Sequence, residues 1–348
     1  MPRLTIATNA VPVPMGQQVY EEEVASRAPA ELGPTWQVRR SVVRTLRSPL
    51  AGTVRVPSYV LANASARTRR AVGALLYPRA DVVHRMGLSL PPAPGPEVLT
   101  IHDTVAWRFP DETRPEPHAA AEARRAAAVV CPSAFAAHDV AERLGIPLPH
   151  AISNGVDPRF ARAEPLGPDV LASLGVSGRY VLHAGGSSLR KNLEGLAGAW
   201  QLVQGALPDV TLVLVGPPSA RRDALFGPLA RALPIGRVSS SILPGLVAGA
   251  EAVVVPSLYE GFGLPALEAM AAGVPVVAAD RSALPEVCGD AGILVEPDPD
   301  GIADGLVWAI SGDPTIEAMV ARGRLRAADF TWERSAAAHA AIWRSLVS

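Results

Sequence analysis

Short hydrophobic runs alternate with longer mixed stretches along most of the chain. In the C-terminal half the runs are too short for helices and are bounded by turn-forming residues, which predicts buried strands. We expect these strands at residues 209–215, 236–240, 252–255, 274–278 and 292–295. The stretches between them predict helices at 220–233, 243–248, 301–311 and 314–328. This alternation predicts a parallel, doubly wound α/β sheet that binds ligands at the carboxyl ends of its strands.

The N-terminal half repeats this pattern less regularly. A first strand is predicted at 4–7, and a helix with acids in its first turn at 21–32. The chain has 348 residues, enough for two domains that each bury a core. We predict Rossmann-like domains over 1–165 and 178–330, with a final segment over 331–348. Residues 157–179, rich in Pro and Gly, are expected to link the two domains.

Composition narrows the class of protein. No apolar run reaches the length of a transmembrane helix, and the N-terminus lacks the pattern of a signal peptide. Cys131 and Cys288 fall in different predicted domains and are interpreted as small buried residues, not as a disulfide or metal pair. These features predict a protein of the reducing cytoplasm.

Charge is unevenly distributed along the chain. The net charge of −1 argues against broad nucleic-acid binding, yet the stretch 32–79 contains nine arginines and no acidic residue. Such a stretch can form a basic surface that holds anionic lipid headgroups or a ligand phosphate, and so allows peripheral contact with the inner face of a membrane. The alternative to a binding surface is that these arginines reflect the arginine-rich composition of the chain and lie on the surfaces of ordinary helices.

The most informative local pattern joins a predicted strand to a predicted helix. The strand at 252–255 leads into Glu260-Gly261-Phe262-Gly263-Leu264, and Glu268 follows within the helix that Pro265 opens. Glycines let backbone N–H groups approach an anion at a helix N-terminus. Carboxylates beside them can accept hydrogen bonds from a sugar diol, so the pattern predicts a nucleotide-sugar site. The alternative interpretation is a tight turn with two solvated acids. It would explain a Gly-x-Gly on its own, but it fits poorly because both glycines, both glutamates and Pro265 occur together.

The only lysine of the chain provides a second signal. Lys191 follows Arg190 in a Gly/Ser turn between a predicted strand and a helix, whereas every other long basic residue is arginine. Because a compact ammonium and a guanidinium are not interchangeable at a phosphate, this placement indicates an anion site.

These motifs resemble those of family-4 retaining glycosyltransferases with the GT-B fold. Residues 260–268 resemble the family's Glu-x7-Glu motif, and 185–193 resemble its Gly-x-x-x-x-Arg-Lys-Asn turn, although many members carry Arg or Thr where Gly186 stands. The segment from His102-Asp103 through Phe109-Pro110 to Glu112 resembles that of mannosyl- and rhamnosyltransferase-like members, with Asp111 inserted. The resemblance implies two Rossmann-like domains that face each other across a cleft. It also implies that the last helix, in 331–348, returns to the N-terminal, acceptor-side domain.

The same resemblance implies roles for individual residues. Glu260 would hold hydroxyls of the transferred sugar, Glu268 the ribose, and Lys191 the pyrophosphate. His102 would contact the reacting sugar, with Asp103 holding its ring; His84 and His118 are interpreted as structural or solvated. The implied catalytic residues are His102, Asp103 and Glu260. The implied donor-binding residues are Gly16, Gly186, Arg190, Lys191, Val238, Glu260, Gly261, Phe262, Gly263, Leu264 and Glu268. Gly16 fits an ordinary helix entrance as well as a phosphate loop.

The implied reaction is retaining transfer of a hexose or deoxyhexose of mannose, rhamnose or glucose type. The donor would be a nucleoside diphosphate sugar, and the acceptor a hydroxyl of a glycan, glycolipid or small molecule. We expect no metal, no further cofactor and no nucleic-acid partner. The alternatives are a nucleotide-sugar epimerase of similar fold and a non-catalytic nucleotide-sugar-binding protein. A nicotinamide-dependent oxidoreductase is disfavoured, because no Gly-x-Gly-x-x-Gly follows the first strand.

Overall fold

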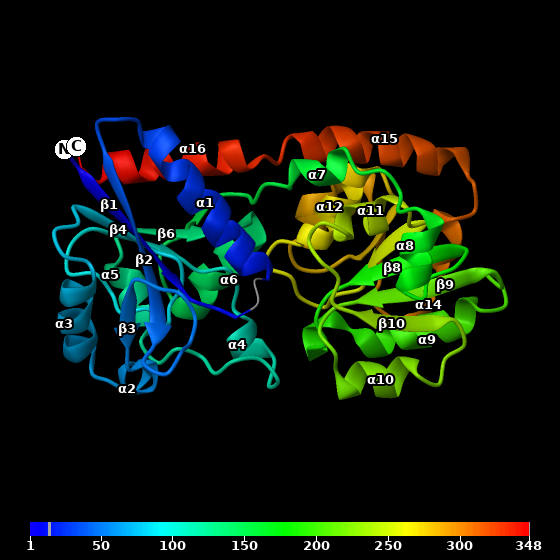
Figure 1. The fold of residues 1–348 in the computed structure, drawn as a ribbon, viewed down its shortest axis with the longest axis horizontal. Helices are drawn as coiled ribbons and strands as arrows, with labels where there is room; N and C mark the ends of the chain where they lie inside the picture. Colours follow the sequence, from blue (N-terminus) through cyan, green and yellow to red (C-terminus); the bar gives the residue numbers. More distant parts are fainter. Residues whose placement is uncertain (13–14, 348) are drawn as a thin grey trace. The chain divides into compact units, whose positions relative to one another are not determined.

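The computed structural model describes residues 1–12 and 15–347 (Figure 1). Contacts divide the chain into two units. Unit 1 comprises Met1–Arg108, Thr113–Gly155 and Trp332–Ser348, and unit 2 comprises Phe109–Glu112 and Val156–Thr331.

Unit 1 is built on a seven-stranded parallel sheet in the order β3-β2-β1-β4-β5-β6-β7. Its strands are β1 (Arg3–Asn9), β2 (Gln37–Thr45), β3 (Val54–Val56), β4 (Val82–Arg85), β5 (Glu97–Thr100), β6 (Ala128–Cys131) and β7 (His150–Ala151). Its helices are α1 (Gly16–Leu32), α2 (Ser58–Ala62), α3 (Ala66–Leu76), α4 (Val105–Arg108), α5 (Ala119–Arg125), α6 (Ala134–Leu144) and α16 (Trp332–Ser345). The strand order reverses between β1 and β4, as in other doubly wound sheets.

Helix α16 is the last helix of the chain, yet it packs against α1 in unit 1 (Figure 1). Its residues Trp332, Ala340 and Trp343 are buried in the same core cluster as Leu4 and Ile6 of β1. The predicted return of the C-terminal helix to the first domain is therefore confirmed.

Unit 2 is built on a six-stranded parallel sheet in the order β10-β9-β8-β11-β12-β13. Its strands are β8 (Arg179–Ala184), β9 (Val210–Val215), β10 (Ala232–Gly236), β11 (Ala252–Val255), β12 (Val276–Ala279) and β13 (Ile293–Val295). Its α-helices are α7 (Pro158–Ala161), α8 (Pro168–Ser173), α9 (Leu193–Val203), α10 (Ala220–Phe226), α11 (Leu243–Ala248), α12 (Leu264–Ala272), α13 (Leu284–Cys288), α14 (Pro299–Ala309) and α15 (Pro314–Ala328). Two 3₁₀ turns, η1 (Leu189–Lys191) and η2 (Gly289–Ala291), complete it.

Both faces of the unit 2 sheet are covered. Val253 and Val255 of β11 belong to one buried cluster, whereas Val254 belongs to another. Successive side chains of a strand point to opposite faces, so the two clusters are the two layers of a doubly wound unit. The predicted α/β class is confirmed for both units.

Three sequence predictions in this region were wrong. The helix expected at 220–233 ends at Phe226, because Pro228 follows two residues later and has no N–H to continue the helical hydrogen bonding. The strand expected at 236–240 is β10, which begins at Ala232. The expected linker 157–179 is not a free connection: it forms α7 and α8, and Phe160 is buried in the core of unit 2.

The arginine-rich stretch 32–79 contains β2 and β3 as well as two helices, and one of its arginines is structural. Arg69 is fully buried, and its Nε donates to Glu122 Oε1 over 2.7 Å. Arg85 of β4 donates to Glu122 and, over 3.0 Å, to Glu97 Oε1. Each buried charge thus has an opposite partner, as burial requires.

Candidate active site

The predicted strand-to-helix turn is present in unit 2. It runs from β11 into α12, whose first turn contains Pro265. Gly263 precedes the helix with φ of 112°, and a Cβ added there would lie 2.8 Å from Leu284 Cδ2. The left-handed backbone conformation requires glycine at this position. Phe262 is buried beside Phe330, with ring centroids 5.9 Å apart.

Glu260 is the most strongly coordinated acid of this turn. It is 7% exposed, and its Oε1 accepts hydrogen bonds from Lys191 Nζ at 2.5 Å and Ser257 Oγ at 2.8 Å. Its Oε2 accepts from Arg190 Nη1 at 3.0 Å. Burial alone would raise the pKa of Glu260, but the charges of Lys191 and Arg190 outweigh it and lower the pKa to about 2. Glu260 is therefore ionised at neutral pH.

Lys191 and Arg190 lie in the predicted Gly/Ser turn, at the carboxyl end of β8. Burial lowers the pKa of Lys191, and the Glu260 carboxylate opposes that shift. Asn192 has φ of 54°, and its side chain donates to the carbonyls of Pro256 and Pro297 over 3.1 and 2.6 Å. The turn is therefore tied to the loops that follow β11 and β13.

The glycines of this turn are held from α10. Arg222 is fully buried, and its Nη2 donates to the carbonyls of Gly185 and Gly186 over 2.6 and 3.2 Å. A Cβ added at Gly186 would have no heavy atom within 4 Å, so the fold has room for the Arg or Thr of other family members. The sequence pattern missed Arg222, because nothing distinguishes it from the many other arginines.

Glu268 differs sharply from Glu260. It lies on α12, and among residues 1–12 and 15–347 no hydrogen bond or ion pair to it is found. Burial, with a smaller contribution from the Asp157 charge, raises the pKa of Glu268 to about 8. Val238, the remaining predicted donor residue of unit 2, packs against the core cluster that includes Phe262.

His183 is a buried polar residue that the sequence analysis did not select. It lies on β8, two residues before Gly185, and its Nδ1 is 3.1 Å from the carbonyl oxygen of Val254. A carbonyl only accepts, so Nδ1 carries the proton. Burial lowers the pKa of His183 to about 4, which leaves Nε2 as an unprotonated nitrogen without a partner in the described structure.

The structure places the other predicted residues, Gly16, His102 and Asp103, in unit 1. Gly16 is the first residue of α1, where Gln18 accepts a hydrogen bond from the Met15 N–H over 3.0 Å. Asp103 Oδ1 accepts from the N–H of Val105 at the start of α4.

His102 follows β5 and is packed against Tyr20 of α1. The two ring centroids are 4.8 Å apart at an interplanar angle of 90°. Burial lowers the pKa of His102 to about 4, and the neighbouring His339 adds to the shift, whereas a hydrogen bond to the Met86 backbone opposes it. His102 is therefore neutral at pH 7, and its Nε2 has no hydrogen-bond partner in the described residues.

Tyr20 is held in turn by α16. Its hydroxyl lies 2.7 Å from His339 Nε2, and His339 Nδ1 lies 2.7 Å from the carbonyl oxygen of Ser335. Because that carbonyl only accepts, Nδ1 is protonated. Burial lowers the pKa of His339 to about 4, so its Nε2 accepts the Tyr20 proton.

A second histidine continues this hydrogen-bond chain. Trp343 Nε1 can only donate, and it lies 3.2 Å from His84 Nδ1. His84 is fully buried, which lowers its pKa, so its proton lies on Nε2, 2.8 Å from Thr100 Oγ1. Thr100 lies 3.0 Å from the Tyr20 hydroxyl. The interpretation of His84 as structural is supported, and the chain links α16, β4, β5 and α1.

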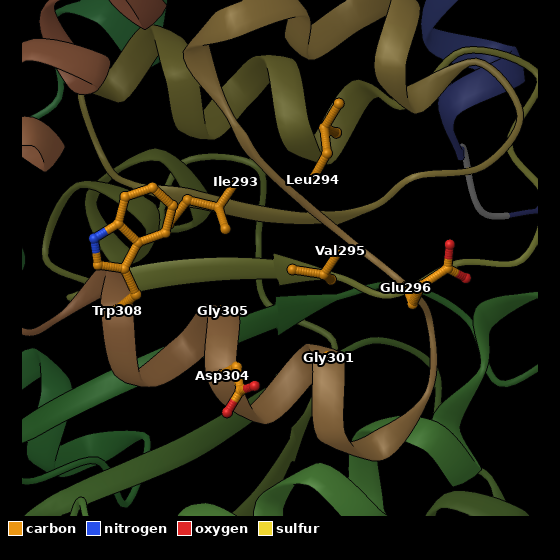
Figure 2. A pocket seen from close by; sticks show the side chains of 8 residues that line it. All are labelled: Ile293, Leu294, Val295, Glu296, Gly301, Asp304, Gly305 and Trp308. Atoms are coloured by element: carbon orange, nitrogen blue, oxygen red, sulfur yellow. The ribbon is translucent and has the colours of Figure 1, made fainter.

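One pocket of unit 2 involves none of the predicted residues. It is lined by β13 and α14, with Trp308 beside Ile293 and Val295 further along the strand (Figure 2). Across the described residues there is no group of His, Cys, Asp or Glu that could hold a metal ion. In the same part of the chain, no helix has both the length and the apolar character needed to cross a bilayer.

Comparison with known families gives the context for these sites. The model described as Glycosyl transferases group 1 matches residues 178–311, and the model described as Glycosyltransferase Family 4 matches residues 18–160. The chain belongs to the family-4, group 1 glycosyltransferases.

Among curated relatives of this family-4 chain, O-antigen chain mannosyltransferase B of Escherichia coli is 40% identical over 166 residues. The match covers 44% of this chain and 42% of the relative, so the chain spans less than half of that protein's length.

Solved structures show the same fold over the full length. Sucrose-phosphate synthase from Thermosynechococcus elongatus has a TM-score of 0.77 at 22% identity, with 99% of each chain covered. Anabaena Alr3699/HepE in complex with UDP has a TM-score of 0.75 at 18% identity, covering 99% of this chain and 100% of that one. At these identities the likeness shows the GT-B fold alone.

Proposed function

We propose that this chain is a retaining hexosyltransferase that uses a nucleoside diphosphate sugar. The observation that carries the proposal is the ionised, buried Glu260 held by Lys191 and Arg190 at the start of α12. This combination offers acceptors for sugar hydroxyls beside cations for a diphosphate. The family relationship and the UDP bound to a protein of the same fold support a nucleotide donor.

In the proposed reaction, the bond between the anomeric carbon and the diphosphate oxygen breaks. The acceptor hydroxyl oxygen bonds to that carbon on the same face, and its proton passes to the departing diphosphate. Negative charge grows on the diphosphate as the bond breaks, and Lys191, Arg190 and the N–H groups of residues 261–264 would stabilise it there. No metal ion is required in this scheme, because fixed cations stabilise the leaving group.

The remaining predicted residues complete the proposed site. Glu260 would orient sugar hydroxyls once these compete with its present partners, and Glu268 would accept from the ribose diol. Gly186, with open space at its Cα, and Val238 would border the nucleotide. His102, neutral and with an unprotonated Nε2, would contact the reacting sugar, with Asp103 shaping the loop after β5. Gly16 would lie at the donor phosphates.

We propose a mannose-, rhamnose- or glucose-type sugar as the transferred group, because the curated relative named above is a mannosyltransferase. The acceptor class would be a hydroxyl of a glycan, glycolipid or small molecule in the cytoplasm. Peripheral membrane contact would involve α3, where Arg67 and Arg70 are exposed near Leu75, which is 81% exposed.

Two measurements test the proposed function. Nucleoside diphosphates and their sugars are screened by thermal shift, since a ligand at a hundred times its Kd adds about 2.7 kcal/mol of stability. Mass spectrometry then follows sugar transfer to hydroxyl acceptors. An epimerase would change the donor sugar without any acceptor, and a non-catalytic binding protein would bind donors without turnover. Either result would replace the transferase proposal.

Variants locate the site. Lys191→Ala should weaken nucleoside diphosphate binding by roughly 1.5–3 kcal/mol, because a charge-assisted phosphate contact is lost. Arg179→Ala is the control, since Arg179 pairs with Asp209 and Glu251 at the amino ends of the strands. Calorimetry that gives equal Kd values for Lys191→Ala and wild type would reject Lys191 as a phosphate ligand.

A further inference from the structure

A short acidic segment accompanies the proposed phosphate turn. Residues Phe109–Glu112, here called the acidic tab, belong to unit 2 although the chain on either side of them belongs to unit 1. Phe109 anchors the tab through an edge contact with Tyr259, with ring centroids 6.2 Å apart. Asp111 Oδ2 accepts a hydrogen bond from the backbone N–H of Leu189 at 2.7 Å.

The second acid of the tab contacts the basic pair directly. Glu112 Oε1 accepts from Arg190 Nε at 2.9 Å, and the two side chains are 21% and 20% exposed. Arg190 also donates to Glu260, which in turn accepts from Lys191. Two cations and two carboxylates therefore interact in one cluster, and the positive charge that a diphosphate requires is already balanced.

The tab contacts a backbone N–H and a guanidinium, two kinds of group that bind phosphate in other proteins. A backbone N–H carries one proton and makes one strong hydrogen bond, so the Leu189 N–H serves either Asp111 or a phosphate oxygen. The Nε proton of Arg190 is limited in the same way. A bound diphosphate would also lie close to two like charges, which disfavours its binding. The carboxylates of the tab therefore occupy the hydrogen-bond donors that a diphosphate would use.

We propose that Asp111 and Glu112 compete with the donor diphosphate for the turn at 185–192, and so set the affinity for the donor. This inference rests on the proposed function, because it takes the same turn as the diphosphate site. The competition is for phosphate groups only, so the affinity for a nucleoside without phosphates does not depend on the tab.

The test compares Asp111→Asn/Glu112→Gln with wild type by calorimetry, using inorganic pyrophosphate, UDP, GDP and the matching nucleosides. We expect the double variant to bind pyrophosphate and the preferred diphosphate roughly three- to thirtyfold more tightly, the range of such charged pairs. Nucleoside binding should not change. Phe109→Ala, which loosens the tab but keeps its charges, should shift the same Kd values in the same direction by a smaller factor.

A matched control removes the same number of charges elsewhere. Asp209→Asn/Glu251→Gln deletes two acids that pair with Arg179, away from the turn at 185–192, and it should leave every Kd unchanged. Unchanged or weaker diphosphate binding by the tab variant, with wild type binding measurably, overturns the inference and makes Glu112 a positioning residue for Arg190. If wild type, tab variant and control all fail to bind any diphosphate, the proposed function itself is wrong.

Discussion

Glu260 and Glu268 have opposite charge states at neutral pH because their surroundings differ. Glu260 has the smaller exposed fraction of the two, yet two cations and a hydroxyl keep its pKa at about 2. Glu268 has no such partners among the residues that the structure describes, and burial raises its pKa to about 8. The folded state thus binds a proton at Glu268 that the unfolded chain has released. The stability that this adds is complete below about pH 4.5 and is lost as the pH rises through about 8.

Glu268 gives a pH-dependent prediction. An ionised carboxylate accepts hydrogen bonds from both ribose hydroxyls more strongly than the protonated acid does. Nucleotide affinity should therefore rise between pH 6 and 9 with a midpoint near 8. Glu268→Gln should weaken binding and remove this pH dependence. Glu260→Gln should keep it and should lower turnover more than nucleotide binding, because Glu260 is proposed to hold the sugar. Calorimetry across this pH range would contradict the prediction if wild type and Glu268→Gln gave parallel curves.

His102 gives a prediction about turnover. If its ring orients a sugar hydroxyl or stabilises charge in the transition state, His102→Ala should lower kcat more than it raises the KM for the donor. A packing residue would instead lower the melting temperature and leave turnover nearly intact. Tyr20 packs on His102, so Tyr20→Phe serves as a second variant. It keeps the ring contact with His102 and removes only the Tyr20 hydroxyl. Near-normal kcat with a reduced melting temperature for His102→Ala would identify a structural role.

Helix α16 is joined to β4 and α1 by hydrogen bonds as well as by apolar packing. Trp343→Phe keeps most of the packing but leaves the buried His84 Nδ1 without a donor, which should cost about 1–3 kcal/mol of unfolding free energy. The buried histidines here also have lowered pKa values, so stability should fall as the pH drops from about 6.5 toward 4.

The free energy of unfolding is measured by titration with urea, with tryptophan fluorescence as the signal for the unfolding of unit 1. Trp308→Phe, on the exposed side of α14 in unit 2, is the control for the loss of a tryptophan and should change the stability of unit 1 little. If both substitutions cost the same, the hydrogen bond to His84 contributes nothing measurable.

The sequence predicted unit 2 best. Its strands are short apolar runs buried on both faces, and the motifs at Lys191 and Glu260 stand where strands end, so local pattern and topology agree. The sequence could not reveal which arginines are buried: Arg69 and Arg222 look like their neighbours, and partners such as Glu122 and Gly185 come from distant chain segments. The membership of the acidic tab in unit 2 was equally hidden, because it depends on contacts across about 80 residues.

The placement of α16 leads to a prediction for the whole chain. Its Trp332 and Trp343 are fully buried in unit 1, and removing such side chains costs about 3–5 kcal/mol each, against a typical domain stability of about 5–15 kcal/mol. A chain that stops at Thr331 should therefore keep unit 2 folded, since no residue after Thr331 belongs to it, while unit 1 loses most of its stability.

Hydrogen exchange followed by mass spectrometry measures the two units separately. In the chain ending at Thr331, amides of β1 should lose protection from exchange and amides of β11 should keep it, because β1 packs in the same core cluster as the two tryptophans. A chain that stops after Leu346 retains all of α16 and should match wild type at both strands. Equal loss at β1 and β11 would mean that the units unfold together, and full protection at β1 would mean that α16 is dispensable for its core. The expected difference in protection between β1 and β11 arises only if α16, the last helix of the sequence, stabilises β1, the first strand.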